Sequence, residues 1–158
     1  MKVAGSVALV TGADRGLGRV FAGELVGRGA AKVYGAARNP AAVAQPGVTP
    51  IALDITDPER VARVAHECSD VTLLVNNAGV MKASPFIGAP SLDAARLEME
   101  TNYFGTLSMC RAFAPVLAAG GGAIVNMMSV TSFYTNRCER VINSDHRFAS
   151  PRGVPLPP

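Results

Sequence analysis

Short runs rich in apolar residues alternate along this chain with stretches of helical spacing. These runs predict strands at residues 7–10, 32–37, 48–53, 71–75 and 123–128. The continuous β-branched and leucine run at 71–75 indicates a strand that is buried on both faces, as in a parallel sheet. Strands that alternate with helices imply right-handed crossovers, so we expect an α/β fold with a doubly wound parallel sheet of about five strands, which is incomplete for this architecture.

Two of the predicted helices carry clear signals. A helix begins at Pro58, with Thr56 or Asp57 as its N-cap. Its core face is expected at Val61, Val64 and Ala65. The longest helix is predicted from Ser91 to Ala118, and we interpret its apolar stripe as core or subunit packing, which allows a homo-oligomer through this helix. The stripe comprises Tyr103, Leu107, Cys110, Ala114 and Leu117.

The connection between the first strand and the first helix holds three glycines, in Thr11-Gly12-Ala13-Asp14-Arg15-Gly16-Leu17-Gly18. Glycines can adopt positive φ, let a diphosphate approach the backbone, and bring a helix close to a strand. The unpaired N–H groups of the first helical turn would face that ligand, and an anion is their natural partner. The glycines predict a Rossmann-like cofactor turn, although a plain strand-to-helix turn uses similar residues.

Composition narrows the class of protein. Of the 158 residues, 49% are hydrophobic and 17% are charged, which predicts one α/β domain with a substantial core. The isoelectric point of about 9.0 raises the question of nucleic-acid binding. Residues 1–135 nevertheless hold 11 basic and 10 acidic residues, and the other four arginines are scattered over residues 136–158. We therefore expect a domain at 1–135, an irregular Arg/Pro-rich tail at 136–158, and no nucleic-acid partner.

Cysteine content and hydropathy bear on the compartment. Cys68, Cys110 and Cys138 form no C-x-x-C pair, which argues against a metal site and favours thiols in a reducing cytoplasm. No apolar run approaches the roughly 20 residues that a membrane span needs. The N-terminus also lacks the apolar region of a signal peptide. These features predict a soluble cytoplasmic protein with no membrane partner.

A second motif, Asn76-Asn77-Ala78-Gly79, closes the fourth predicted strand. Together with the glycine turn it resembles the short-chain dehydrogenase/reductase family, from Val3 to about Asn136. The resemblance implies an oxidoreductase that transfers hydride between a nicotinamide and a carbonyl or alcohol substrate. The asparagines would tie strand ends together, and small residues would let the ribose and nicotinamide pass. The cofactor-binding positions so implied are Gly12, Asp14, Arg15, Gly16, Leu17, Gly18, Asn76, Ala78 and Gly79.

Two arginines point to the form of the cofactor. The position about 20 residues beyond the glycine turn, where a carboxylate usually accepts ribose hydroxyls, is Arg38. A guanidinium there can pair with a 2′-phosphate and stack on adenine, and Arg15 could supply a second positive charge. The resemblance thus favours NADP(H) over NAD(H). Both arginines could instead be solvated surface residues.

The resemblance also implies roles at other strand ends. Asp54 would meet the adenine amino group while Ile55 covers the ring, unless Asp54 merely helps to begin the next helix. Asn102 would kink the long helix and hold a water of a proton relay, unless it is an exposed helix residue. Ser129, at the end of the fifth strand, would orient the substrate carbonyl.

The remainder of the family's catalytic set is missing. The family places a general-acid Tyr beyond the serine and a Lys one turn after it, but Tyr134 does not match and no Lys follows Lys82. The Arg- and Pro-rich sequence after Asn136 is what a truncated gene or altered reading frame would produce, or a genuine short variant with a disordered tail. The chain is therefore an oxidoreductase of doubtful activity or a non-catalytic nucleotide- or partner-binding fragment.

Overall fold

The computed structural model describes residues 2–82, 84 and 88–129. The chain divides into two units, each of which is described by itself. The first holds Met1–Ala78 and Phe104–Met127, and the second holds Gly79–Tyr103 and Met128–Pro158. The tail predicted at residues 136–158 lies outside the described residues, so the expected domain division remains a prediction.

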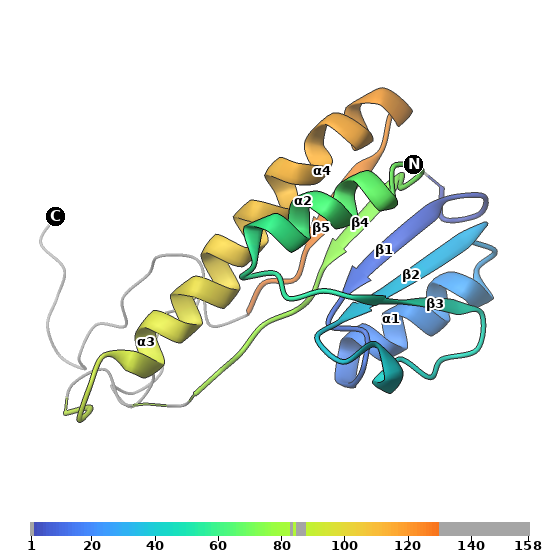
Figure 1. Ribbon diagram of the computed structural model, residues 1–158. Coiled ribbons are helices and arrows are strands. Elements are labelled where there is room, and N and C mark those ends of the chain that lie inside the picture. The colour runs from blue at the N-terminus through green and yellow to red at the C-terminus, as the bar shows by residue number, and fades with distance from the viewer. Residues whose placement is uncertain (1, 83, 85–87, 130–158) are drawn as a thin grey trace, which may run out of the picture. The chain divides into compact units, whose positions relative to one another are not determined.

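The first unit is built on a parallel sheet of five strands, as predicted (Figure 1). The strand order is β3-β2-β1-β4-β5, so the chain starts in the middle of the sheet. It adds β2 and β3 on one side of β1, and then crosses over to add β4 and β5 on the other side. Val10 of the central strand is in register with Gly35 of β2 and Val75 of β4. The strands are β1 (Val7–Thr11), β2 (Lys32–Ala37), β3 (Val48–Ala52), β4 (Leu73–Asn76) and β5 (Ala123–Asn126).

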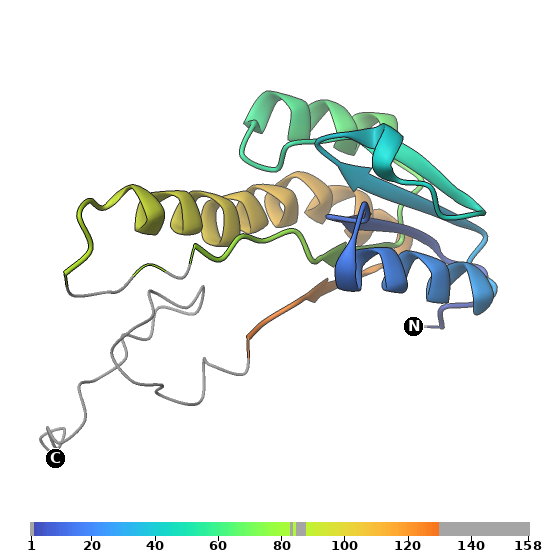
Figure 2. The ribbon, with the colours of Figure 1, turned by 90° about the horizontal axis from the view of Figure 1, so that it is seen from below.

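The helices lie on both faces of this sheet. The helix α1 (Gly16–Gly27) covers one face, whereas α2 (Pro58–Glu67) and α4 (Thr106–Gly120) cover the other and contact each other (Figure 2). A short 3₁₀ turn, η1 (Pro40–Ala42), follows β2. The N-cap of α2 is Asp57, whose carboxylate accepts the Arg60 N–H at 3.0 Å, which settles the choice between Thr56 and Asp57.

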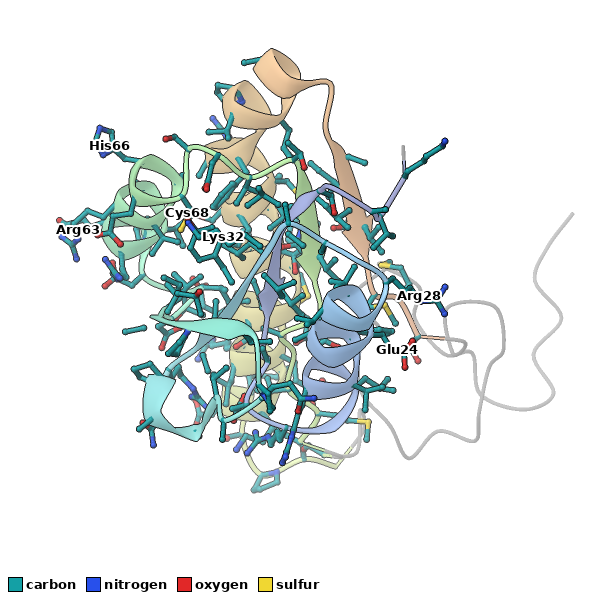
Figure 3. All side chains as sticks on the ribbon, turned by 90° about the vertical axis from the view of Figure 1, so that its right-hand side faces the viewer. Glu24, Arg28, Lys32, Arg63, His66 and Cys68 are labelled. Atoms are coloured by element: carbon teal, nitrogen blue, oxygen red, sulfur yellow. The ribbon has the colours of Figure 1, made fainter. Side chains whose placement is uncertain are left out.

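Charged side chains project outward from both helical layers. Figure 3 shows Glu24 and Arg28 on the outer surface of α1, and Arg63 and His66 on that of α2. Glu24 and Arg28 form an i,i+4 ion pair at 3.3 Å between two largely exposed side chains. Exposed pairs of this kind contribute little to stability, since solvent screens them. The fold is therefore held by its apolar layers.

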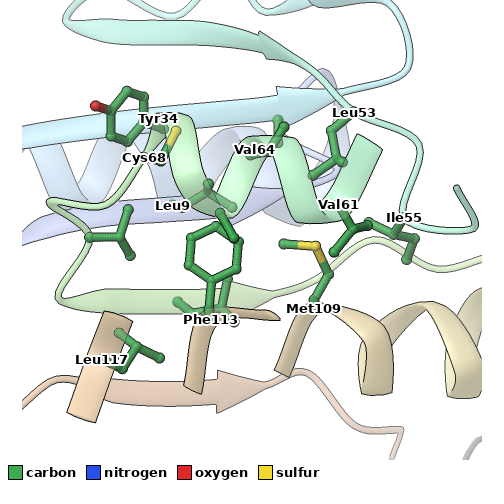
Figure 4. Close-up of a cluster of buried hydrophobic side chains, with 14 residues drawn as sticks. Leu9, Tyr34, Leu53, Ile55, Val61, Val64, Cys68, Met109, Phe113 and Leu117 are labelled. Carbon is green, nitrogen blue, oxygen red and sulfur yellow. The ribbon is translucent and has the colours of Figure 1, made fainter. Parts of the chain in front are cut away.

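The larger apolar layer lies between the sheet and the helices α2 and α4. Figure 4 shows Phe113 of α4 pointing toward Leu9 of β1, with Met109 directed toward Val61 of α2. Phe113, Leu9 and Met109 are completely buried. The predicted core face of α2 is confirmed, since Val61, Val64 and Ala65 are all buried. The smaller layer lies against α1 and contains Ala8, Val10, Ala13, Ala22, Leu25, Val33, Leu73 and Val75.

The long helix departs from the prediction in its interior. It starts as α3 (Asp93–Glu98), continues as the π-helical segment η2 (Met99–Gly105), and returns to α-helix in α4. Most of the predicted apolar stripe lies outside the core, since Leu107 and Ala114 are exposed and Cys110 is only partly buried, so subunit packing through this stripe stays a prediction. A Cβ on Gly105 would lie 2.8 Å from Cγ1 of Ile55, so this glycine sets the side that faces the core. Buried residues follow at every fourth position: Met109, Phe113 and Leu117.

Several strand boundaries also differ from the predicted ones. The fourth strand begins at Leu73 rather than at residue 71, and the third ends at Ala52. The fifth strand ends at Asn126, and one further bond joins the Met127 N–H to the Asn76 carbonyl. Ser129 therefore lies three residues beyond the strand that was expected to end with it.

Truncation of Phe113 tests the larger apolar layer. We expect Phe113→Ala to lower the free energy of unfolding by about 3–5 kcal/mol, because it removes a fully buried ring and leaves a cavity. Leu107→Ala on the same helix, at a side chain that is 41% exposed, should cost less than about 1 kcal/mol. Urea denaturation measures both values. Equal losses would mean that α4 does not pack as described.

Candidate functional site

The glycine turn contains three glycines that the structure requires for three different reasons. Gly12 has a φ of +69°, and a Cβ there would lie 3.0 Å from the Ala78 Cα. Gly16 has a φ of +54° and nothing within 4 Å of its Cβ position, so it meets only a conformational requirement and leaves space for a ligand. Gly18 has an ordinary φ, but a Cβ would lie 2.2 Å from the Gly12 carbonyl oxygen. The turn therefore combines a left-handed backbone at Gly12 and Gly16 with close packing at Gly12 and Gly18.

The hydroxyl of Thr11 joins this turn to the Asn76-Asn77-Ala78 segment at the end of β4. Thr11 is almost completely buried, and its Oγ1 accepts the N–H groups of Asn77 and Ala78 at 3.0 and 2.9 Å. In return, Asn77 Nδ2 donates to the Thr11 carbonyl at 2.9 Å. Sequence reasoning did not select Thr11 as a functional residue. A polar residue at the end of an apolar run was the available signal.

The N-terminus of α1 is left open toward a ligand. Its N-cap residue, Arg15, has an extended backbone and makes no side-chain capping bond, and the first turn contains no acidic residue. The N–H groups of the first turn therefore lack an anionic partner from the cap. Arg15, Gly16 and Leu17 are exposed, and Asp14 is partly buried. This arrangement fits a bound diphosphate, since the helix end carries partial positive charge and the space at Gly16 is empty.

The ends of β2 and β3 bring two of the predicted residues together. Arg38 directly follows β2 and is exposed, and its positive charge acts on Asp54, which lies beyond the end of β3. Burial alone would raise the pKa of the Asp54 carboxyl, but hydrogen bonds from Thr56 and the charge of Arg38 lower it below its ordinary value. Oδ1 of Asp54 accepts the Thr56 N–H at 2.9 Å and its hydroxyl at 2.7 Å. Asp54 is thus an ionised group in the turn before α2, while Asp57 caps the helix itself.

Ile55 occupies a different place from that implied for an adenine-covering side chain. It is 6% exposed and belongs to the larger apolar layer, where it faces Gly105. Its assignment to the cofactor site remains a prediction.

Asn76 ties two strand ends together, as its position in the motif led us to expect. Its Nδ2 donates to Asn126 Oδ1 of β5 at 2.9 Å and to Cys110 Sγ of α4 at 3.3 Å. Burial raises the pKa of the Cys110 thiol, while its hydrogen bonds with Asn76 and Asn126 oppose that shift, so the neutral thiol is favoured. Oδ1 of Asn76 is buried and has no hydrogen-bond partner within the described residues. This oxygen is an acceptor still to be satisfied.

In the second unit, Asn102 lies in the middle of the π-helical segment and binds the backbone of Val80, which follows Gly79. Its Oδ1 accepts the Val80 N–H and its Nδ2 donates to the Val80 carbonyl, both at 2.8 Å. Asn102 is partly buried and makes two hydrogen bonds, which contradicts the alternative of an exposed helix residue. Single π turns inside α-helices are frequent at functional sites. Gly79 and Ser129 are exposed, and the catalytic roles of Asn102 and Ser129 remain predictions.

Two other kinds of site receive no support from the described residues. They contain no group of three or more His, Cys, Asp or Glu side chains placed to hold a metal ion. Within the same ranges, no helix combines the length and the apolar character needed to cross a membrane.

Comparison with known proteins gives consistent matches. Residues 6–141 match the short chain dehydrogenase family. A sorbitol dehydrogenase of Cereibacter sphaeroides is 38% identical over 140 residues, which cover 82% of this chain and 54% of that protein. Human L-xylulose reductase is 32% identical over 159 aligned residues, covering 96% of this chain and 62% of that protein. The chain thus spans a little over half the length of these curated relatives.

A solved structure agrees with these matches. The crystal structure of a short chain dehydrogenase from Burkholderia cenocepacia in complex with NADP is 46% identical to this chain and superimposes with a TM-score of 0.85. The alignment covers 92% of this chain and 61% of that protein. In that structure, a protein of the same fold holds NADP.

Alanine substitutions in the glycine turn separate packing from conformation. We expect Gly18→Ala to lower the free energy of unfolding by about 2–3 kcal/mol, because its Cβ would collide with the Gly12 carbonyl. Gly16→Ala should cost about 1 kcal/mol, the penalty for a left-handed backbone in open space. Chemical denaturation compares the two. A Gly18 variant as stable as the Gly16 variant would refute the close approach of the turn.

Proposed function

The chain belongs to the short-chain dehydrogenase family, and we propose that it binds NADP(H), in preference to NAD(H), at the carboxyl ends of its central strands. The observation that carries this proposal is the open N-terminus of α1. There the first-turn N–H groups are left without a side-chain cap, beside a glycine that leaves empty space. A diphosphate would supply the negative charge that this helix end lacks.

Two arginines support the preference for the phosphorylated cofactor. Arg15 precedes α1 and Arg38 follows β2, the strand beside β1, and both side chains are exposed. A guanidinium binds a 2′-phosphate through paired hydrogen bonds, whereas a carboxylate at either position would repel it. The NADP complex of the Burkholderia cenocepacia relative is consistent with this choice.

Catalysis by this chain would be weak. A bound nicotinamide supplies hydride exchange with a carbonyl or alcohol carbon of a small substrate. Ser129 would orient the substrate oxygen, and Asn102 would hold the segment at Val80 and a relay water. The 158 residues contain no Tyr and Lys in the spacing of the family's proton donor, because no Lys follows Lys82. Without that donor, proton transfer to the substrate oxygen would have to come from water.

A second candidate function follows from the same missing residues. The chain would then be a nucleotide-binding or partner-binding module without catalysis. It could join a full-length relative, or another copy of itself, through the long helix, whose Leu107 is 41% exposed. A location in the cytoplasm stays a prediction under both functions.

Replacement of Arg38 tests the cofactor preference. We expect Arg38→Ala to weaken NADPH binding about tenfold, or about 1.4 kcal/mol, and to leave NADH binding nearly unchanged. Calorimetric titration measures both. Arg63→Ala is the matched control, because Arg63 lies on the outer surface of α2 in an exposed ion pair with Glu59. Equal losses of affinity for NADPH and NADH would contradict a contact between Arg38 and the 2′-phosphate.

Turnover separates the two candidate functions. We expect a saturable rise in thermal stability with NADPH, together with very slow oxidation of the cofactor in the presence of sugar ketones or other small carbonyl compounds. The loss of absorbance by the reduced nicotinamide measures the oxidation of the cofactor. Reduction at an ordinary enzymatic rate would show that this chain supplies its own proton donor, and a flat stability titration would rule out cofactor binding.

A further inference from the structure

The two edges of the sheet in the first unit differ in how they are protected. β3 forms one edge and carries Pro50 in its middle, which has no N–H to offer to a further strand. β5 forms the other edge, and residues 123–127 contain neither a proline nor a charged side chain. Prolines and charges are two of the devices that keep foreign strands away from a sheet edge. Within the described residues, the side of β5 that faces away from β4 is therefore an open edge.

The backbone of β5 presents polar groups to this open edge. The N–H groups of Ala123 and Met127 each donate at 2.9 Å to a carbonyl of the neighbouring segment 72–76. Because the direction of the backbone groups alternates along a strand, the N–H and C=O groups of Ile124 and Asn126 point away from β4. Outward groups of this kind are a template for pairing with another strand.

Apolar side chains at the open edge are only half covered. Ile124 is 39% exposed, Val125 is 43% exposed and Met127 is 40% exposed. Val125 is in register with Val75, so it extends the smaller apolar layer toward the rim of the sheet, while Ile124 points to the opposite face. All of these residues belong to the first unit. A strand beside β5 would remove apolar surface from water on both faces of the sheet.

We propose that a second copy of this chain pairs with β5 in the antiparallel direction and forms a dimer with a continuous sheet. A two-fold axis at Val125 places Ile124 opposite Asn126 of the partner subunit. Residues opposed in this way exchange both of their backbone hydrogen bonds, so the outward groups of Ile124 and Asn126 are all paired. Val125 then faces its own counterpart, which is a favourable cross-strand pair of β-branched side chains. The paired strands bring no like charges together, since residues 123–127 carry none.

The symmetry of this contact limits the assembly to a dimer. Each copy uses its open edge, and Pro50 protects the other edge of the described sheet, so the pairing closes on itself. β5 is 4 residues long, which makes the interface small. Interfaces that bury less than about 1,200 Å² are typically transient. We therefore expect monomer and dimer to exchange, through a surface different from the long helix.

Amide hydrogen exchange on the ¹⁵N-labelled full chain tests this pairing residue by residue. We expect the N–H groups of Ile124 and Asn126 to exchange about tenfold more slowly as the chain concentration is raised through the monomer–dimer transition. Sedimentation velocity locates that transition. The N–H groups of Ala123 and Met127 are internal controls, because the segment 72–76 holds them at every concentration. Alternation along one strand distinguishes edge pairing from a general gain in stability.

Two variants test the position of the axis. Val125→Lys places two positive charges opposite each other, and we expect it to weaken dimerisation about tenfold, or about 1.4 kcal/mol. Leu107→Lys is the matched control, because it adds the same charge at a side chain of α4 that is similarly exposed, at 41%. It should leave the dimer unchanged. Should Val125→Lys fail to fold, the exchange experiment on the unchanged chain still decides.

Four results would overturn the inference. The first is a chain that stays monomeric at every concentration, and the second is a species larger than a dimer. The third is slow exchange of Ile124 and Asn126 in the monomer, which would assign the open edge to residues 130–158 of the same chain. The fourth is loss of the dimer with Leu107→Lys and not with Val125→Lys, which would place the interface on the long helix.

Discussion

The site depends on one buried hydroxyl group. Thr11 ends the central strand, and its Oγ1 accepts two N–H groups from the end of β4. This contact brings the glycine turn against Asn77 and Ala78 so closely that Gly12 can carry no side chain. A turn that follows β1 and a motif that follows β4, more than 60 residues later, thereby become neighbours. The reversal of strand order between β3 and β4 makes this possible, because it places β4 beside β1.

Electrostatics at this edge of the sheet favour a negatively charged ligand. The open end of α1 offers N–H groups, and Arg15 and Arg38 add two exposed positive charges. Two carboxylates also lie at this edge: Asp14 in the glycine turn, and Asp54, which is engaged by Thr56 and lies under the influence of Arg38. The lowered pKa of Asp54 keeps its carboxyl group ionised, so it can accept a hydrogen bond from an amino group.

The sequence predicted the position of the five strands well, because a parallel sheet needs apolar runs. The inner strands β1, β2 and β4 are buried, whereas the edge strands β3 and β5 are exposed or only partly buried. The turn glycines were predicted from their spacing, and the motif asparagines were expected to tie strand ends together, although the partner of Asn76, Asn126, was not predicted. The buried face of the long helix was not predicted, since it depends on where Gly105 meets Ile55 and on a π turn that changes the helical period. The burial of Glu98, whose carboxylate accepts the Lys82 N–H, was also missed, because a glutamate in a helix ordinarily faces solvent.

The central claim is that a dinucleotide diphosphate binds at the start of α1. The most direct test is to follow backbone amide resonances of the ¹⁵N-labelled chain while NADPH is added. Our account predicts the largest shifts at Gly16, Leu17 and Gly18, with smaller shifts around Arg38, and weaker shifts with NADH. Shifts confined to other parts of the chain, or no shifts at all, would contradict it.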